Sequence, residues 1–324
     1  MNKTDSLVVK SISQWITEGK TFFLCTIISA KGASVRPLGS LFAYDGESKV
    51  GFISEPGMDH AFCKHLDEAN FQEDITYFTY GNQLMNKDND LCLPCCGTVT
   101  LMIEKFSPTQ KSIELLKEWT SLVERRVTFR RTIDKNNYAS NLEEPTSPLT
   151  AEEKKLTNNS DEIKITYTPT IQVLIIGATP VSKHLARLAS ELGFIVRLCE
   201  NRKLFLEILE YDKANNNFEL SKTSSGVFVQ SYVDKYSSIV SLAHDPSIDD
   251  DAIIAALSSD SFYVGAIGST KNCDKRVRRL SKNGIDESLL SKLHAPIGIS
   301  INSKTPDEIA ISIIAEIIEH KHKL

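Results

Sequence analysis

The chain has 324 residues, of which 41% are hydrophobic and 24% are charged, and its formal net charge is −5. This length favours two domains, since a single hydrophobic core seldom grows beyond about 250–300 residues. The negative charge gives no footprint for nucleic acid, no apolar run approaches the roughly 20 residues of a membrane-spanning helix, and the first residues lack the apolar core of a signal peptide, so we expect a cytoplasmic protein without nucleic-acid or membrane partners.

The first 133 residues predict a domain of mixed α/β structure with short strands and irregular loops. Helices are expected at residues 8–18 and 108–123, and strands at 21–29, 41–45, 50–54, 75–80, 97–106 and 125–133. The sequence DGES between the second and third strands indicates a hairpin turn. Asp59 is expected to cap a short helix that carries Ala61, Phe62 and Leu66.

Residues 134–162 are polar, contain Pro145 and Pro148 and have little apolar content. Such a composition is typical of an exposed linker or a long loop. We therefore place an N-terminal domain at residues 1–133, a polar linker at 134–162 and a C-terminal domain at 163–324.

The C-terminal domain alternates strands with helices. Strands are predicted at 171–176, 194–200, 237–244 and 262–269, and helices at 181–192, 249–259, 272–284 and from Thr305 onward. At the last start, Thr305, Pro306 and Glu308 combine an N-cap, a proline at the first helical position and a capping-box glutamate. The run 171–176 is continuously apolar, which suits a parallel strand covered on both faces. The pattern predicts a Rossmann-like, doubly wound parallel sheet with right-handed crossovers.

The first strand of this domain ends in a glycine turn that departs from the dinucleotide-binding fingerprint G-x-G-x-x-G. Of the three glycines only Gly177 is present. Thr179 places a side chain where the diphosphate would lie, and Pro180 removes one backbone N–H from the start of the helix. Glu200 follows the second strand, about where an acid that binds the ribose belongs. The turn favours a Rossmann scaffold without a tight dinucleotide site over conventional NAD binding.

The turns that follow the parallel strands are expected to line one edge of the sheet, because the carboxyl ends of the strands meet there. These turns contain Gly177, Glu200, His244, Asp245, Gly265, Gly268 and Ser269. Backbone amides and small side chains at this edge can cradle a phosphate, and His244 can act as an acid or base. Equally, the glycines can serve only tight turns, and Asp245 can cap the helix that follows.

Several longer segments resemble one protein family. FYVGAIGSTKNCDKRVRRL and HAPIGISINSKTPDEIAISIIAEII are similar to the C-terminal domain of the xanthine dehydrogenase accessory factor family, also called the XdhC/CoxI family, and AHDPSIDDDAIIAAL fits the stretch just upstream. TIISAKGASVRPLGSLFAY resembles the family's N-terminal motif, in which a strand leads into a Ser-x-Arg-Pro-x-Gly-Ser loop. LPCCGTVTLMIE resembles its Pro-Cys-Gly-Gly entry to a strand. The similarity spans nearly the whole chain except the expected linker.

The resemblance implies a two-domain maturation factor, often dimeric, for molybdenum hydroxylases. Such a protein binds molybdenum cofactor (molybdopterin), free or as a dinucleotide, has it sulfurated, and delivers it to an apo molybdenum hydroxylase. A cysteine desulfurase is then a further expected partner, and the chain acts as a carrier more than as an enzyme. We expect the ligand between the N-terminal loops and the Rossmann edge. Two alternatives stay open, namely an NAD(P)-dependent oxidoreductase and a protein-interaction scaffold that has lost its ligand.

The family motifs carry over to specific positions of this sequence. The matching residues are Ser34, Arg36, Pro37, Gly39, Ser40, Pro94, Cys95, Gly97, Gly177, His244, Asp245, Gly265, Gly268, Ser269, His294, Ala295, Pro296 and Gly298. Two turns depart from the family pattern. Met58 stands where relatives carry a cysteine, Glu55 replaces a glycine, and Thr179 and Pro180 alter the first Rossmann turn.

Two of these positions have side chains with chemistry of their own. Cys95 follows Cys92 and precedes Cys96, and its thiolate can bind a soft metal or accept sulfur; the alternative is an incidental thiol. Arg36 can hold a phosphate or a pterin carbonyl through two parallel hydrogen bonds, or it can pin its loop through an ion pair.

Other charged and polar residues have simpler expected roles. His294 is expected to brace the sheet edge. The basic run Lys275, Arg276, Arg278 and Arg279 is expected to form a solvated helix face, with contact to a phosphate or an acidic partner as the alternative.

Overall fold

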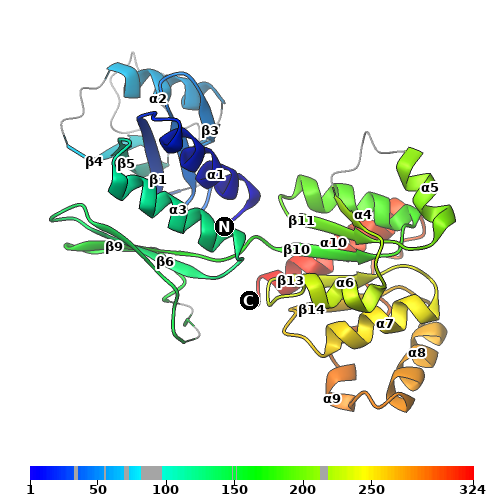
Figure 1. The fold of residues 1–324 in the computed structure, drawn as a ribbon. Helices are drawn as coiled ribbons and strands as arrows, with labels where there is room; N and C mark the ends of the chain where they lie inside the picture. Colours follow the sequence, from blue (N-terminus) through cyan, green and yellow to red (C-terminus); the bar gives the residue numbers. More distant parts are fainter. Residues whose placement is uncertain are drawn as a thin grey trace. The chain divides into compact units, whose positions relative to one another are not determined.

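The computed structural model describes residues 1–32, 36–54, 56–68, 73–81, 97–147, 149–150, 152–211 and 218–324. The chain divides into two compact units, Met1–Pro169 and Thr170–Leu324 (Figure 1). No helix among these residues is long and apolar enough to cross a membrane.

The first unit is built on an antiparallel sheet in the order β3-β2-β1-β5-β4. Its strands are β1 (Phe22–Lys31), β2 (Leu41–Tyr44), β3 (Lys49–Gly51), β4 (Ile75–Gly81) and β5 (Thr98–Phe106). Its helices are α1 (Lys3–Thr17), α2 (Pro56–Glu68) and α3 (Gln110–Glu124). The expected hairpin is confirmed, because Phe42 pairs with Gly51 and Tyr44 with Lys49 across β2 and β3.

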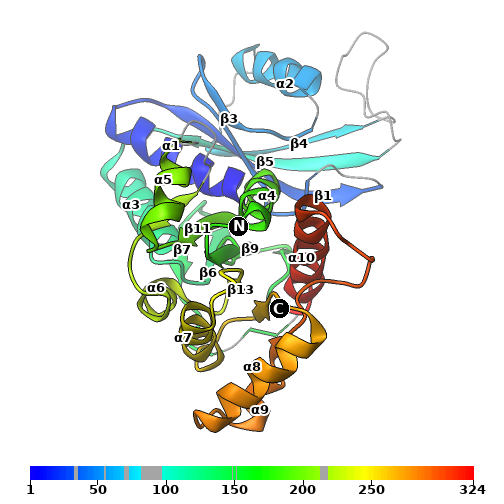
Figure 2. The ribbon, with the colours of Figure 1, turned by 90° about the vertical axis from the view of Figure 1, so that its right-hand side faces the viewer.

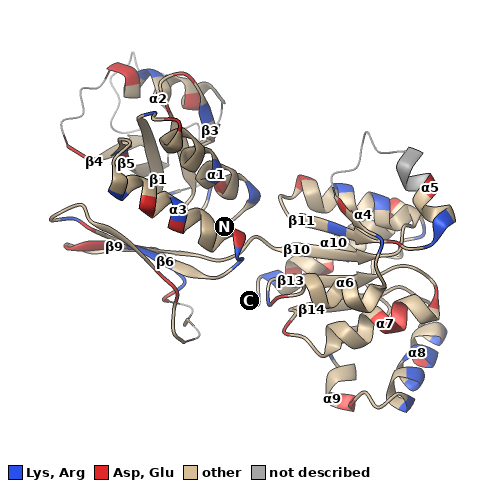
Figure 3. Ribbon diagram, viewed as in Figure 1, with Lys and Arg blue, Asp and Glu red and all other residues tan. Residues whose placement is uncertain are grey.

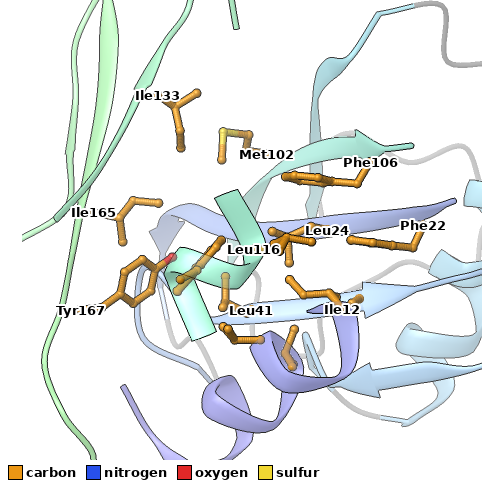
Figure 4. Close-up of a cluster of buried hydrophobic side chains, with 14 of the residues drawn as sticks. Ile12, Phe22, Leu24, Leu41, Met102, Phe106, Leu116, Ile133, Ile165 and Tyr167 are labelled. Atoms are coloured by element: carbon orange, nitrogen blue, oxygen red, sulfur yellow. The ribbon is translucent and has the colours of Figure 1, made fainter. Parts of the chain in front are cut away.

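The alternation of side chains along β1 divides the core of this unit between the two faces of the sheet. Leu24 packs with residues of α1 and α3, including Ile12 and Leu116 (Figure 4). Cys25 and Ile27 point to the opposite face, which α2 covers.

A second sheet completes this unit, where a linker was expected. Its strands are β6 (Phe129–Asp134), β7 (Ser140–Glu143), β8 (Thr157–Asn158) and β9 (Glu162–Tyr167), in the order β7-β6-β9-β8. Ile163, Ile165 and Tyr167 alternate along β9 and are buried in the same core as Leu24. Residues 134–162 are therefore not a linker between domains, because they contain β7 and β8 and join β6 to β9 within one sheet, which the apolar side chains of β9 hold on the core. The division between the units falls after Pro169, not within 134–162.

The second unit is a six-stranded sheet in the order β12-β11-β10-β13-β14-β15, with every neighbouring pair parallel. Its strands are β10 (Gln172–Ile176), β11 (Ile195–Cys199), β12 (Glu219–Ser221), β13 (Ser237–Ser241), β14 (Tyr263–Ala266) and β15 (Leu293–His294). Its helices are α4 (Pro180–Glu191), α5 (Lys203–Tyr211), α6 (Ser225–Tyr232), α7 (Pro246–Leu257), α8 (Thr270–Lys282), α9 (Glu287–Leu290) and α10 (Pro306–Lys321). The predicted Rossmann-like sheet is confirmed.

Helices cover both faces of this sheet (Figure 2). Val173 and Ile175 of β10 pack on the side of α4 and α10, whereas Leu174 and Ile176 pack on the side of α6 and α7. This is the apolar strand buried on both faces that the sequence predicted. At the start of α10 the Glu308 carboxylate accepts a hydrogen bond from the backbone N–H of Thr305 at 3.2 Å, which agrees with the predicted capping box.

The strand order reverses between β10 and β13. The chain proceeds from β10 to β11 and β12 on one side and then crosses to β13 on the other. Ligands of open α/β sheets bind at such a switch point, beyond the carboxyl ends of the strands. The turns after β10, β11 and β13 are therefore candidate positions for a ligand.

Candidate functional site

Glu200, at the end of β11, has the position of a ribose-binding acid but already uses its acceptor capacity. Its carboxylate accepts hydrogen bonds from the backbone N–H of Ala178 at 2.8 Å and of Arg202 at 2.9 Å. The guanidinium of Arg202 donates two more, from Nε at 2.9 Å and from Nη2 at 2.7 Å. A carboxylate offers about four lone-pair sites. Four donors thus leave no free acceptor for a ribose hydroxyl.

Arg202 extends this arrangement across the switch point. Its Nη1 donates to the backbone carbonyl of Ala243, after β13, at 3.2 Å. Burial by itself would raise the pKa of Glu200, but the hydrogen bonds from Arg202 and from the backbone of Ala178 outweigh it and hold that pKa below its ordinary value. Glu200 is therefore an ionised partner of Arg202, and we call these two residues with their bond to Ala243 the Glu200–Arg202 latch.

The start of α4 is also hydrogen-bonded within the protein. The backbone N–H of Thr179 donates to the hydroxyl of Ser182 at 3.2 Å, and the N–H of Ser182 donates to the hydroxyl of Thr179 at 3.3 Å. Pro180 has no N–H to offer. Gly177 has φ +92° and lies so close to Ala243 that an added Cβ would be 2.4 Å from its Cα. The amides and the space that a diphosphate needs are thus largely taken.

His244 and Asp245 differ in what they offer after β13. Asp245 is the N-cap of α7, where its carboxylate accepts from the backbone N–H of Ser247 at 2.9 Å and from the Ser247 hydroxyl at 2.7 Å. Asp245 therefore has the helix-capping role that was the alternative to ligand binding. His244 has φ +58° and is exposed, so its ring is accessible to a ligand at this edge.

The glycines after β14 have structural reasons to be glycine. A Cβ on Gly265 would lie 2.5 Å from Cδ1 of Ile297, which packs over this strand. A Cβ on Gly268 would lie 3.2 Å from Sγ of Cys273. Ser269 is the N-cap of α8. These contacts account for the three residues without a ligand, and their role in cofactor binding stays a prediction.

Three consecutive aspartates of α7 hold the surrounding elements, a role that the sequence analysis missed. Asp249 accepts from the Ser241 hydroxyl at 2.6 Å and pairs with Arg276 at 3.1 Å. Asp250 receives two hydrogen bonds from Arg279, at 2.7 and 2.9 Å. Asp251 accepts from the backbone N–H of Gly226, at the start of α6, at 2.6 Å.

The basic run of α8 is consequently not one solvated face. Arg276 is buried, with 9% of its side chain exposed, and Arg279 is half-buried against α7, because both reach the aspartates there. Lys275 and Arg278 are exposed. An acidic run and a basic run on helices that follow neighbouring strands could have indicated this pairing.

His294 braces β15 against α10, as expected. Its Nδ1 lies 2.9 Å from Oε1 of Glu316, and the other oxygen of Glu316 accepts from the Tyr263 hydroxyl and from the backbone N–H of Gly298, both at 2.6 Å. Burial opposes ionisation of Glu316, yet the hydrogen bonds from His294, Tyr263 and Gly298 lower its pKa. One carboxylate thus fixes the segment that carries the HAPIG motif.

In the first unit, Arg36 forms a buried ion pair. Its side chain is 3% exposed, and Nη2 lies 2.5 Å from Oδ1 of Asp5 in α1. Nη1 donates to the carbonyl of Phe52 at 2.7 Å, and the guanidinium lies 4.5 Å from the centre of the Phe52 ring. This is the loop-pinning alternative. Gly39 has φ +83°, and its N–H donates to the carbonyl of Ile27 at 2.7 Å, so it closes the same loop onto β1.

Three glycines meet where β1 and β4 end and β5 begins. A Cβ on Gly32 would be 3.0 Å from Cα of Gly97, and a Cβ on Gly81 would be 2.3 Å from the Gly97 carbonyl oxygen. Gly97 is therefore a packing position at the edge from which both motif loops leave. Ser34 and Cys95, with Pro94, lie outside the described residues, so the roles predicted for them stay predictions.

Met58 and Asp59 show what the altered turn does here. Met58, at the position of the relatives' cysteine, is 8% exposed and belongs to the core under α2. Asp59 does not begin the helix as predicted, because α2 starts at Pro56. Its carboxylate instead accepts from the backbone N–H groups of Ile53 at 2.9 Å and Ser54 at 3.2 Å, which closes the turn after β3.

Several buried hydroxyls of the first unit lack a hydrogen-bond partner among the described residues. The side-chain oxygens of Ser40, Ser54 and Tyr80 are buried and make no hydrogen bond within the described part of the chain. Unpaired buried hydroxyls are uncommon in folded proteins. They are donors and acceptors that a polar ligand or water can satisfy.

Comparisons with known proteins agree with this architecture. A family model described as the XdhC Rossmann domain matches residues 173–317. The chain is 23% identical over 303 residues to the molybdenum cofactor insertion chaperone PaoD of Escherichia coli (strain K12), a similarity that covers 93% of this chain and 84% of that protein. It is 21% identical to a protein of Bacillus subtilis (strain 168) described as a probable xanthine dehydrogenase subunit, over 93% of each chain.

A solved structure extends the likeness to both units. The crystal structure of a xanthine dehydrogenase from Bacillus halodurans has a TM-score of 0.71 and 20% identity, and covers 99% of this chain and 96% of that chain. At this identity the likeness establishes the fold. Residues 173–317, most of the second unit, match the model of the XdhC Rossmann domain, and the resemblance to the XdhC family that the sequence motifs carried is confirmed.

Proposed function

We propose that this protein is a cytoplasmic accessory factor that binds molybdenum cofactor and assists its sulfuration and its insertion into a xanthine dehydrogenase-type molybdenum hydroxylase. The observation that carries the proposal is the similarity, over 93% of this chain, to a molybdenum cofactor insertion chaperone. The sulfur donor would be a cysteine desulfurase, and the active form a homodimer.

The first unit offers groups that fit a pterin. The hydroxyls of Ser40, which precedes β2, of Ser54, which follows β3, and of Tyr80, in β4, are buried and unpaired among the described residues. A pterin ring presents several hydrogen-bond donors and acceptors, and a buried hydroxyl can serve as either. In the sequence Cys95 stands two residues before Gly97, which precedes β5, and we propose its thiolate as the ligand of the metal.

The second unit fits a dinucleotide poorly, which weighs against the oxidoreductase alternative. Glu200 has its acceptors occupied by Ala178 and Arg202, and Gly177 leaves no room beside Ala243. NAD(P) binding in the conventional mode would require the Glu200–Arg202 latch to open. A Rossmann scaffold hosts many functions, and here it supports a carrier better than a hydride-transfer enzyme.

Anaerobic purification followed by pterin fluorescence and molybdenum analysis tests the proposal. We expect both to copurify with the full chain, and we expect no hydride transfer with nicotinamide cofactors. Cys95→Ser should lower the bound molybdenum, while Cys96→Ser, a neighbouring thiol on the same loop, should not. Protein that carries neither pterin nor molybdenum, and that takes up neither when they are supplied, would exclude the proposed function.

The finer parts of the proposal need separate assays. Sulfur bound to the cofactor should appear only when a cysteine desulfurase and cysteine are present. Activity should then appear in an apo molybdenum hydroxylase to which the loaded protein is added. Sedimentation of the purified chain tests the homodimer, and a single monomeric species would remove that part alone.

A further inference from the structure

Helix α8 carries an unusual concentration of positive charge for a protein with a net charge of −5. Its sequence, TKNCDKRVRRLSK, contains six cationic side chains and one acidic one. Two of the six, Arg276 and Arg279, pair with Asp249 and Asp250 of α7. The other four are not needed to hold α8 in place.

These four residues form a stripe, and we call it the basic stripe of α8. It consists of Lys271, Lys275, Arg278 and Lys282. At about 100° per residue, spacings of four, three and four place them within roughly 60° of the helix circumference. All four are exposed, and none forms an ion pair with the described part of the chain. The stripe is about 16 Å long, at about 1.5 Å per residue.

The arrangement has a cost for the isolated protein. Like charges three or four positions apart destabilise a helix by their repulsion. Acidic residues lie near the stripe, but they do not neutralise it. Asp274 lies on the flank of the stripe, and Asp286 and Glu287 follow in the next turn and at α9, yet none of these three forms an ion pair with it among the described residues. Figure 3 shows the blue segments of α8 beside the red of α7.

The shape of the stripe limits what it can bind. An exposed helix face is convex, so it cannot enclose a small ligand, which proteins bind in concave sites. Duplex DNA carries one negative charge per about 1.7 Å along its whole length, so it would meet more long-range repulsion from a chain with net charge −5 than an acidic patch on a protein would. An acidic protein surface with carboxylates spread over about 16 Å, as three turns of a helix provide, matches it in sign and length.

We propose that the basic stripe of α8 docks an acidic surface of a partner protein, and that this partner is the molybdenum hydroxylase that receives the cofactor. The identity of the partner rests on the proposed function, whereas the chemistry of the surface does not. Charge complementarity of this kind steers the encounter and depends strongly on salt.

Two variants of the full chain with equal charge test the proposal. The stripe variant combines Lys271→Gln, Lys275→Gln, Arg278→Gln and Lys282→Gln. The control combines Lys10→Gln, Lys105→Gln, Lys111→Gln and Lys117→Gln, which are exposed in the first unit and form no ion pair with its described residues. Both change the net charge from −5 to −9, since four positive charges are removed. Binding to poly-L-glutamate, to duplex DNA and to a xanthine dehydrogenase-type apo-enzyme of the same organism is measured from about 50 to about 300 mM salt.

We expect the wild-type chain to bind poly-L-glutamate and the apo-enzyme, the stripe variant to bind both at least about 10-fold more weakly at low salt, and the control to bind as the wild type does. If binding weakens equally in the stripe variant and the control, net charge alone explains the loss, and the proposal is overturned. Tighter binding to DNA than to poly-L-glutamate, lost in the stripe variant, would overturn it in favour of a nucleic acid. Pterin content, measured on the same samples, should not differ between the wild type and the two variants. Absence of pterin from all three, together with binding of poly-L-glutamate that depends on the stripe, would refute the proposed function but not the acidic docking surface.

Discussion

Breaking the Glu200–Arg202 latch from its two sides should cost unequal amounts of stability. The side chain of Glu200 is 1% exposed and that of Arg202 is 24% exposed. Arg202→Gln leaves a buried carboxylate that keeps two backbone donors but loses its counter-charge, which costs about 3 kcal/mol. Glu200→Gln leaves a guanidinium that water can reach, so it costs about 1–2 kcal/mol, for the hydrogen bonds that are lost. We therefore expect Arg202→Gln to destabilise the second unit by about 1–2 kcal/mol more than Glu200→Gln.

Urea unfolding can assign this loss to one unit. Both tryptophans, Trp15 and Trp119, lie in Met1–Pro169, so tryptophan fluorescence follows the first unit while far-ultraviolet circular dichroism follows both. The variants should shift the dichroism transition and leave the fluorescence transition in place. Equal losses for the two variants, or a shift in fluorescence, would refute the reasoning from burial.

Three further results are expected. Glu104→Gln should shift the fluorescence transition by about 3–5 kcal/mol, because Arg131, whose side chain is 0% exposed, loses the carboxylate with which it pairs; an unchanged midpoint would contradict a buried pair. Folding lowers the pKa values of Glu200 and Glu316, so the free energy that their ionised forms add to stability is present above the pKa of the unfolded state and is lost as pH falls through the pKa of the folded state. The stability of the second unit, followed by circular dichroism, should therefore fall on acidification below about pH 4.5. A loss of stability confined to neutral pH would contradict this assignment. Gly265→Ala should cost the second unit about 1–3 kcal/mol through its contact with Ile297, whereas Gly57→Ala, in helix α2 with nothing within 4 Å of the new Cβ, should stabilise the first unit by about 0.4–1 kcal/mol.

Period-two and period-3.6 patterns predicted most strands and helices, and the parallel sheet followed from their alternation. Helices α5 and α6, of nine and eight residues, were not predicted. Other failures lie where the apolar signal is short. EIKITY has the alternation of a strand, with Ile163, Ile165 and Tyr167 on one face. The predicted boundary between the linker and the C-terminal domain falls within this segment, so its pairing with the first unit was missed. Helix α9 and strand β15 have four and two residues, too few for a period to show.

The sequence predicted where the candidate site lies, but not which residues of the protein hydrogen-bond to its side chains. The sequence placed Glu200 at the end of the second parallel strand, as the structure does. It could not tell that Arg202, two residues on, would turn back onto it rather than face solvent, because a rotamer decides that. Arg36 is a similar case, since its partner Asp5 lies 31 positions away and only the packing of α1 brings the two together.

The hydrogen bonds at the start of α4 have a consequence for the empty protein. Ligand binding stabilises a fold by mass action, and a site full of unpaired groups makes the empty state fragile. Here Thr179, Ser182 and Glu200 already satisfy the amides at the switch point. The second unit therefore needs no ligand to complete its hydrogen bonds at the switch point, and its own contacts set its melting temperature. A cofactor bound at the first unit, as proposed above, should raise the melting temperature of that unit and leave the transition of the second unit in place.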